Sequence, residues 1–201
     1  AGLLFPTWGR ALIGGHDVRE NPVAAKRLIG YIPDFPYLYD RLTAAEFMEF
    51  IAGIYRLDRA RAAEAIAGRL DLLGLAGAAG ELIRNLSHGY RQRLVFAATL
   101  LHEPKVLIID EPMVGLDPRT GRLIKDLLRE HCRGGGTVFI STHTLPVAEE
   151  IADRVGIIDE GRLVAAGSLA ELREKSGAAG RLEEIFFKLT EETAESGPDP
   201  A

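Results

Sequence analysis

The spacing of apolar residues changes along the chain and separates segments of strand from segments of helix. Residues 10–14 and 27–32 are short apolar runs that predict strands, and Pro33 ends the second. From Thr43 to about Leu75 apolar residues recur every three or four positions, as they do on one face of an amphipathic helix. This segment therefore predicts a pair of helices inserted between strands.

A third helix follows the pair, and beyond it strands and helices alternate. Ser87 can cap the third helix, because a serine oxygen accepts a hydrogen bond from an amide of the first turn. A helix at 120–131 then separates apolar, β-branched strands at 106–109 and 137–140. Strands of this kind joined by helices are typical of a parallel sheet buried on both faces, so the predicted fold class is α/β.

The C-terminal part predicts shorter elements and a tail. The elements are a helix at 145–152, a hairpin of strands 154–158 and 162–165, and helices at 168–175 and 181–191. Residues 190–201 are small, acidic and contain proline, a composition that predicts a disordered tail.

Charge, hydropathy and cysteine content exclude several classes of protein. The net charge is −5, and four acidic residues in the last dozen account for most of it, so the rest of the chain is nearly neutral. Nucleic-acid-binding surfaces are normally basic, and we therefore expect no nucleic-acid partner. No apolar run approaches the ~20 residues that span a bilayer. Cys132 is the only cysteine, which excludes an internal disulfide and suits a reducing cytoplasm.

Two consecutive carboxylates follow the strand at 106–109. Asp110 and Glu111 lie at its carboxyl end, where ligands bind in open α/β sheets. Side chains alternate along a strand, so one carboxylate can face a hydrated Mg²⁺ ion while the next holds an attacking water. The alternative is a strand that ends in acidic residues at a solvent-exposed edge.

The strand at 137–140 also leads into polar residues, among them His143. One helix of crossover length separates the two strands, so His143 and Glu111 should emerge at the same edge of the sheet. A histidine there can donate a hydrogen bond to a terminal phosphate oxygen. Ser87 and Gly89 offer a second phosphate contact, because free amides at the start of a helix bind anions. Each of these residues could instead be an ordinary surface or capping residue.

Aromatic residues gather between positions 35 and 55. They could form a groove that receives a short helix of a membrane protein, with aromatic anchors, or they could fill the core of the helical pair. We expect Phe47 and Phe50 in the core and Tyr37 and Tyr39 at a contact surface.

The motifs as a set resemble those of the ATP-binding-cassette (ABC) ATPases. In chain order they are Ser87-His88-Gly89 before Arg91-Gln92-Arg93, then Asp110-Glu111-Pro112, Gly115-Leu116-Asp117-Pro118, and Ser141-Thr142-His143. The resemblance implies one ABC ATPase domain over 1–189. It also implies a P-loop NTPase-like sheet, mostly parallel, that is flanked by helices and carries a small helical subdomain at about 40–102.

The resemblance also implies a role for each candidate residue. Asp110 resembles the Walker B ligand of Mg²⁺, Glu111 the general base for ATP hydrolysis, and His143 the switch histidine. Asp117 resembles the D-loop aspartate at the dimer interface, and residues 87–89 resemble the signature that contacts ATP held by the opposite subunit. The implied partners are a second ABC ATPase subunit, identical or different, in a head-to-tail dimer and a transmembrane permease subunit at the cytoplasmic face of the membrane.

The sequence departs from the family pattern at several places. It contains no G-x-x-x-x-G-K-[ST], the loop that holds the β- and γ-phosphates, because none of its lysines follows a glycine. Residues 1–9 resemble the segment beyond this loop, so we expect the loop and its strand upstream of Ala1 and weak ATP binding by the chain as given. His88 and Tyr90 replace a glycine and a glutamine of the signature. Asp34 replaces a glutamine that senses the metal, and an aspartate could still coordinate Mg²⁺.

Two functions fit these observations. The first is the ATP-binding subunit of an ABC transporter that couples Mg-ATP hydrolysis to transport across a membrane. The apolar face of residues 177–189 resembles the C-terminal helix of export cassettes and favours export. The second is a non-catalytic module that lends Ser87 and Gly89 to the ATP site of a partner.

Overall fold

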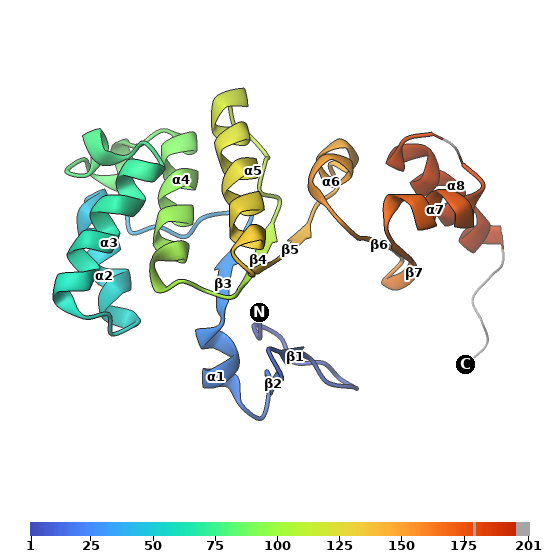
Figure 1. Cartoon of the computed structure of the whole chain (residues 1–201), viewed down its shortest axis with the longest axis horizontal. Coiled ribbons are helices and arrows are strands. Elements are labelled where there is room, and N and C mark those ends of the chain that lie inside the picture. Colours follow the sequence, from blue (N-terminus) through green and yellow to red (C-terminus); the bar gives the residue numbers. More distant parts are fainter. Residues whose placement is uncertain (179, 196–201) are drawn as a thin grey trace. The chain divides into compact units, whose positions relative to one another are not determined.

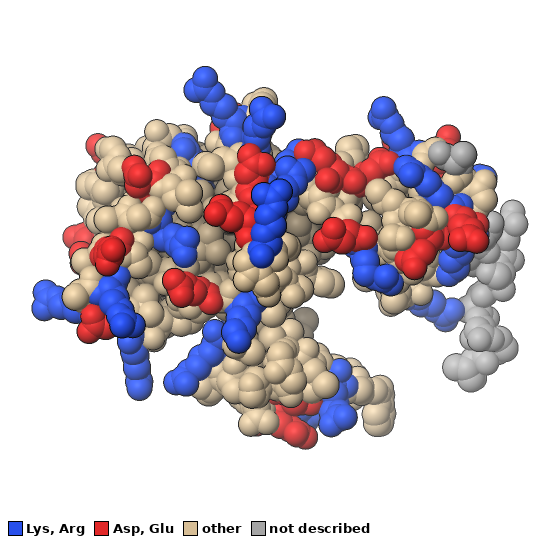
Figure 2. Space-filling model, in the orientation of Figure 1, with Lys and Arg blue, Asp and Glu red and all other residues tan. Residues whose placement is uncertain are grey.

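The computed structural model describes residues 1–178 and 180–195 and divides into two compact units, one of residues 1–141 and one that begins at Thr142 (Figure 1). The sequence predicts one domain over 1–189 and gives no indication of this division into two units. On the face shown in Figure 2, acidic and basic side chains are interspersed.

The first unit contains most of the secondary structure. Its α-helices and strands are β1 (Leu12–Ile13), β2 (His16–Asp17), α1 (Pro22–Arg27), β3 (Ile29–Ile32), α2 (Ala44–Ile54), α3 (Arg59–Leu72), α4 (His88–Thr99), β4 (Val106–Asp110), α5 (Pro118–Arg133) and β5 (Thr137–Ser141). Short 3₁₀ turns at Ala76–Ala78, Ile83–Asn85 and Leu100–His102 complete it.

A parallel sheet in the order β3-β4-β5 is the centre of the first unit. Ile32 lies opposite Ile109, and Asp110 lies opposite Ser141, so the strands end at the same edge. The predictions of an α/β fold and of parallel strands are confirmed. The register brings the residues that follow each strand to one edge of the sheet.

The prediction that the sheet is buried on both faces is wrong for β5. Val138 and Ile140 pack against the core, whereas the alternate residue Phe139 is 62% exposed. Helix α5 packs against β5 on one side. Successive side chains of a strand point to opposite faces, so Val138 and Ile140 are partly buried while the alternate residues are exposed.

The N-terminal strands differ from the prediction. The strand predicted at 10–14 is β1 alone, and it forms an antiparallel hairpin with β2. The strand predicted at 27–32 begins two residues later, because α1 occupies the residues up to Arg27. Pro22 stands at the first position of α1, which suits proline because the amide of that position has no helical partner.

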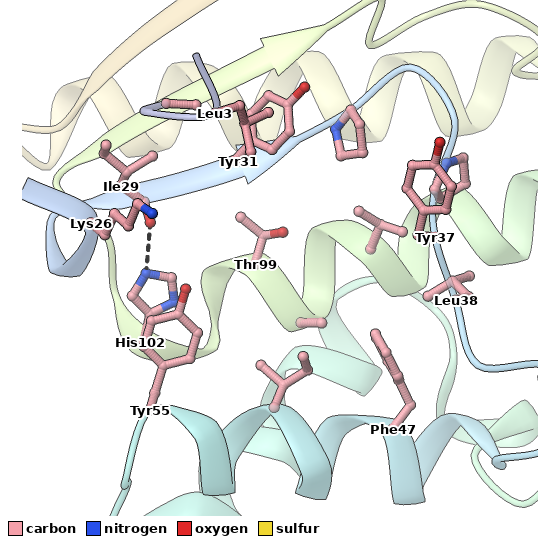
Figure 3. Close-up of a pocket in the computed structure, with 16 residues that line it drawn as sticks. Leu3, Lys26, Ile29, Tyr31, Tyr37, Leu38, Phe47, Tyr55, Thr99 and His102 are labelled. Carbon is pink, nitrogen blue, oxygen red and sulfur yellow. Dashed lines mark hydrogen bonds between the residues drawn. The ribbon is translucent and has the colours of Figure 1, made fainter. Parts of the chain in front are cut away.

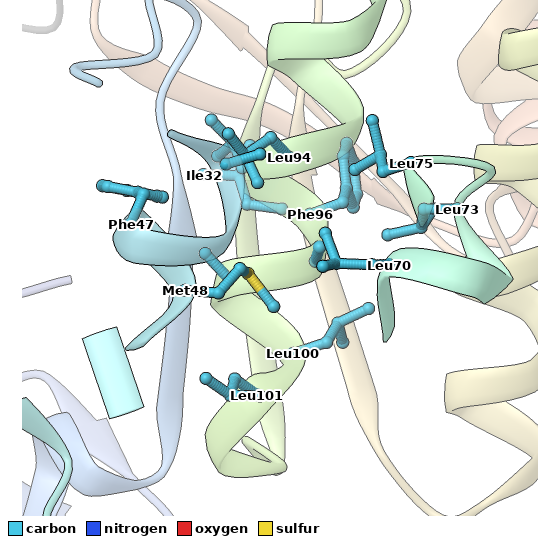
Figure 4. Packing of buried hydrophobic residues seen from close by; sticks show 14 of the residues in the cluster. Ile32, Phe47, Met48, Leu70, Leu73, Leu75, Leu94, Phe96, Leu100 and Leu101 are labelled. Atoms are coloured by element: carbon cyan, nitrogen blue, oxygen red, sulfur yellow. The ribbon is translucent and has the colours of Figure 1, made fainter. Parts of the chain in front are cut away.

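Helices α2, α3 and α4 form a layer whose apolar residues merge with those of the sheet. Thr43 and Glu46 form a capping box at the start of α2, and Ser87 caps α4 as predicted. Figure 4 shows the shared core, in which Phe96 of α4 and Met48 of α2 are fully buried. The segment predicted to be a helical subdomain, about 40–102, holds these three helices.

The second unit is a hairpin packed with helices. Its elements are α6 (Leu145–Ile151), β6 (Val155–Asp159), β7 (Arg162–Gly167), α7 (Leu169–Ser176) and α8 (Leu182–Glu195). The apolar residues of α8, Leu182, Ile185 and Leu189, lie in the core of this unit.

Helix α8 is longer than predicted. It continues to Glu195, so the first half of the predicted tail, 190–195, is helical, and residues 196–201 lie outside the described residues. None of the helices in the described part of the chain is long and apolar enough to cross a membrane.

Candidate functional site

The carboxyl end of β4 presents an acidic side chain to a hydroxyl group of β5. Asp110 accepts a hydrogen bond from Ser141 Oγ at 2.7 Å, and the same hydroxyl lies 3.4 Å from the carbonyl oxygen of Ile109. Sequence reasoning missed this role of Ser141. The contact could be recognised only from the register of the two strands, which places Ser141 opposite Asp110.

Glu111 has a backbone conformation that glutamate rarely adopts. Its φ is +47°, in the left-handed region, which costs a residue other than glycine about 1–2 kcal/mol. Its amide still donates to the Ser141 carbonyl oxygen at 2.9 Å. The hydrogen-bonded ladder therefore extends one residue past β4 while the chain turns sharply, and such strain occurs often at functional sites.

Asp117 stands at the start of α5 and caps it. Its carboxylate accepts hydrogen bonds from Thr120 Oγ1 at 2.6 Å and from the amides of Arg119 at 2.9 Å and Thr120 at 3.1 Å. These bonds, that of the Thr120 hydroxyl first, together with the charge of Arg93, lower the pKa of the Asp117 carboxyl. The carboxylate is therefore engaged in holding its own loop.

The start of α4 lies beside the loop that leads to α5. Ser87 Oγ accepts from the Tyr90 amide at 3.4 Å. A Cβ atom added at Gly89 would lie 3.8 Å from Asp117 Oδ2, and one added at Gly115 would lie 3.2 Å from His88 Nε2. The structure thus brings the signature-like residues and Asp117 together, although they are about thirty positions apart in the sequence.

The two unusual residues of the signature have structural contacts of their own. His88 packs on Gly115, as the short approach shows. The Tyr90 ring supports the Arg93 guanidinium, whose carbon lies 4.3 Å from the ring centroid. Arg93 also donates to the carbonyl oxygens of Gly89 at 3.3 Å and Leu73 at 3.0 Å, so it ties the first turn of α4 to the end of α3.

Asp34 and His143 each follow the end of a strand by two residues. Asp34 is exposed two residues after β3, at the same edge of the sheet as Asp110. His143 follows β5 by two residues and belongs to the second unit. The structure therefore brings together Asp110, Glu111 and Ser141 by direct contact, while Asp34 shares only their edge.

A largely apolar pocket of about 400 Å³ lies between β3 and the helical layer (Figure 3). At one end the rings of Tyr55 and His102 stack, with centroids 3.7 Å apart, and His102 Nε2 lies 3.0 Å from the Ile29 carbonyl oxygen. Phe47 and Tyr37 line the pocket farther along.

The expectations for the aromatic residues are confirmed in part. Phe47 is buried as predicted, and Tyr37 and Tyr39 are 90% and 56% exposed. The core prediction for Phe50 is wrong, because this residue is 43% exposed and meets Tyr39 edge to face at 5.3 Å. The buried residues of α2 include Phe47 and Met48, and at about 100° per residue Phe50 lies beyond Phe47 on the side away from Met48, at the margin of the buried face.

The donor set fits Mg²⁺ better than a transition metal. Among the described residues no group of three or more histidine, cysteine, aspartate or glutamate side chains could hold a metal. Magnesium needs only one or two carboxylates when phosphate oxygens and water supply its other ligands. Asp110 can supply one such carboxylate, whereas residues 1–201 hold no G-x-x-x-x-G-K-[ST] to bind the phosphates.

The chain is similar in sequence to a known protein family and to named proteins. The family model described as ABC transporter matches residues 1–114. DrrA, the daunorubicin/doxorubicin resistance ATP-binding protein of Streptomyces peucetius, is 35% identical over 178 residues, which is 89% of this chain and 54% of that protein. YxlF, an ABC transporter ATP-binding protein of Bacillus subtilis, is 40% identical over 176 residues, 87% of this chain and 57% of that protein. The chain thus spans little more than half the length of these relatives.

Solved structures agree with the sequence matches. An ATP-binding subunit of an ABC transporter has a TM-score of 0.87 and 31% identity, covering 94% of this chain and 79% of that one. CbiO1 of Clostridium perfringens, part of the ABC transporter complex cbiONQ, has a TM-score of 0.72 and 26% identity, covering 92% of this chain and 78% of that one. The α/β fold is that of these P-loop NTPases. The chain belongs to the ABC transporter family.

Proposed function

We propose that the protein is the ATP-binding subunit of an ABC transporter and that it couples Mg-ATP hydrolysis to transport through a separate membrane protein. The observation that carries this proposal is the carboxyl end of β4, where Asp110 is held by Ser141 and Glu111 follows in a strained conformation. The names of the similar proteins, which are ATP-binding proteins of ABC transporters, support it.

The proposed roles divide between the two carboxylates and the histidine. Asp110 would hold Mg²⁺, and the hydrogen bond from the Ser141 hydroxyl fixes the position of its carboxylate. When bound, Mg²⁺ would offset the negative charge of the phosphate groups. Glu111 accepts a proton from the attacking water, and His143 donates a hydrogen bond to the terminal phosphate. Asp34, at the same edge of the sheet, could offer a further oxygen ligand to Mg²⁺.

In a head-to-tail dimer, identical or mixed, the start of α4 reaches the ATP of the second subunit. Ser87 and Gly89 would offer a hydroxyl and free amides to the γ-phosphate. Asp117 fixes the neighbouring loop by capping α5, and its carboxylate is held by Thr120. The role of Asp117 in this proposal is therefore to shape the dimer interface next to the signature.

The membrane partner is a permease that binds at the pocket between β3 and the helical layer, at the cytoplasmic face of the membrane. Exposed Tyr37 and Tyr39 beside an apolar pocket suit a short amphipathic helix of that partner. Similar proteins carry names of drug resistance, among them DrrA and the linearmycin resistance protein LnrL of Bacillus subtilis, which favours export as the direction of transport.

A second function is favoured by one specific observation. Ser87 caps the start of α4, and a helix start of this kind can contact a nucleotide that another subunit holds. A chain of this kind could complete the ATP site of a partner without hydrolysing ATP itself.

The deciding experiment measures Mg-ATP binding and hydrolysis by the full-length protein that contains residues 1–201. Glu111→Gln should lower kcat by about 10²–10⁴-fold, the usual contribution of a general base, and leave ATP binding in place. Glu103→Gln is the matched control, because Glu103 shares the left-handed backbone (φ +53°) and lies at the opposite end of β4. Failure of the wild-type protein to bind ATP would reject the catalytic proposal. Support of a partner's hydrolysis that Ser87→Arg abolishes would then establish the second function.

A further inference from the structure

Arg91, in the first turn of α4, joins segments that are far apart in the sequence. Its Nε donates to the Leu86 carbonyl oxygen at 3.3 Å, and its Nη2 donates to the Arg84 carbonyl oxygen at 3.1 Å. The same Nη2 lies 3.4 Å from Asp40 Oδ1. One guanidinium therefore holds both the approach to α4 and the end of the loop that follows β3.

The main chain of the same two segments is also hydrogen-bonded. The Arg84 amide donates to the Asp40 carbonyl oxygen at 3.4 Å, and the Ile83 amide donates to the Leu42 carbonyl oxygen at 2.9 Å. Just beyond, the capping box of Thr43 fixes the start of α2. Asp40 thus stands at a junction that is held by its side chain and by its backbone.

This junction lies between the two surfaces of the proposed function. Tyr39 precedes Asp40 and is part of the proposed permease contact. Gly89 precedes Arg91 by two residues and is part of the proposed phosphate contact. A displacement of the loop at Tyr39 must therefore move, or break away from, the guanidinium that anchors the start of α4.

We propose that Arg91 is a positioning residue that couples the permease-contact loop, residues 34–40, to the phosphate-contacting start of α4 through its ion pair with Asp40. The inference rests on the proposed function, because it needs the permease and the second ATP. An arginine is required, since its planar fork can serve two carbonyl oxygens and a carboxylate at once, whereas a lysine ammonium on its flexible stem does not hold that geometry.

The first test compares ATP hydrolysis by the isolated protein and by the protein assembled with its membrane subunit in lipid nanodiscs, at saturating Mg-ATP. Asp40→Asn and Arg91→Lys should each lower the ratio of assembled to isolated activity by about two- to fivefold, the factor that corresponds to an exposed ion pair. Asp126→Asn is the matched control, because Asp126 pairs with Arg129 at 3.3 Å within α5 and is similarly exposed. A ratio for both test variants equal to that of the control would overturn the proposal.

The second test needs no permease and no activity. Hydrogen exchange of the isolated protein should show that Asp40→Asn speeds exchange of the amides of residues 84–90 by about two- to fivefold, again the factor expected for an exposed ion pair. Asp126→Asn should leave these amides unchanged. Unaltered exchange at 84–90 in Asp40→Asn would overturn the coupling. If the wild-type assembly has no ATPase activity, the proposed function is rejected. The exchange result then decides whether Asp40 and the start of α4 are coupled.

Discussion

The two ends of the parallel sheet share a backbone feature and differ in chemistry. Glu103, before β4, and Glu111, after it, both have left-handed backbones, with φ of +53° and +47°. At the amino end the neighbouring polar groups are the half-buried histidines His102 and His131, each with one ring nitrogen buried. At the carboxyl end they are Asp110 and the Ser141 hydroxyl. The left-handed backbone alone therefore does not distinguish the two ends, whereas the consecutive carboxylates at the carboxyl end do.

The electrostatics of the two ends also differ. Burial lowers the pKa of His102 and of His131, and in each ring one nitrogen is buried without a hydrogen-bond partner in the described structure, so a proton there would not be satisfied. At the carboxyl end, hydrogen bonds lower the pKa of the Asp117 carboxyl. The amino end thus favours neutral histidines, whereas the start of α5 favours an ionised Asp117.

The largest expected effect comes from replacing each strained glutamate with glycine. Glu111→Gly and Glu103→Gly both release the left-handed strain, and each should raise the free energy of unfolding by about 0.5–1 kcal/mol. Only Glu111→Gly should lower ATP hydrolysis, by about 10²–10⁴-fold. Urea unfolding and a phosphate-release assay measure the two quantities. Equal losses of activity in the two variants would remove the distinction between the ends.

One added methyl group should disturb the packing around His131 at the amino end of the sheet. A Cβ atom at Gly136 would overlap the His131 ring, so Gly136→Ala should lower the free energy of unfolding by about 1–3 kcal/mol. Gly121 of α5 has open space around it, and Gly121→Ala should instead stabilise the protein by about 0.5–1 kcal/mol through helix propensity. Urea midpoints of the two variants test this. A neutral Gly136→Ala would show that the histidine ring moves aside easily.

The smallest expected effects are shifts in the pH dependence of stability, in a different range for each end. The folded-state pKa of His102 lies below its unfolded value of ~6.5, so the folded state binds fewer protons and stability falls as the pH drops below about 6.5. The Asp117 pKa is also lowered, so the stability it contributes is lost only as the pH falls below about 4. Unfolding by urea at pH 7.5, 5.5 and 3.5 should show the first loss reduced in His102→Gln and the second in Asp117→Asn. His16→Gln, at an exposed position of β2, should change neither.

Much of the fold follows from local patterns. The sequence predicts the strands β4 and β5, the capping residue Ser87 and the turn between β6 and β7. Each of these features depends on residues that are close together in the chain. Glu160 and Gly161 of that turn have φ of +44° and +77°, as a tight hairpin turn requires. The sequence analysis does not predict helix α1, because six residues that include one proline are too few to show the helical spacing of apolar residues.

The candidate site was predictable in its residue types and less so in its contacts. Asp110 and Glu111 can be recognised in the sequence because they directly follow an apolar strand. The partner of Asp110, Ser141, depends on strand register, and the meeting of Gly89 with Asp117 depends on how two helices pack. Neither is encoded at any fixed sequence spacing.

By itself the sequence determined the elements, the family resemblance and the carboxylates at the end of β4, because periodicity, caps and motifs act over a few residues. Only the tertiary structure decided that Phe50 is exposed, that one face of β5 is open and that Arg91 reaches Asp40. These outcomes depend on which distant surfaces cover one another and on which acceptor a long side chain reaches. Both are settled by packing across the whole unit, where every segment competes for the same neighbours.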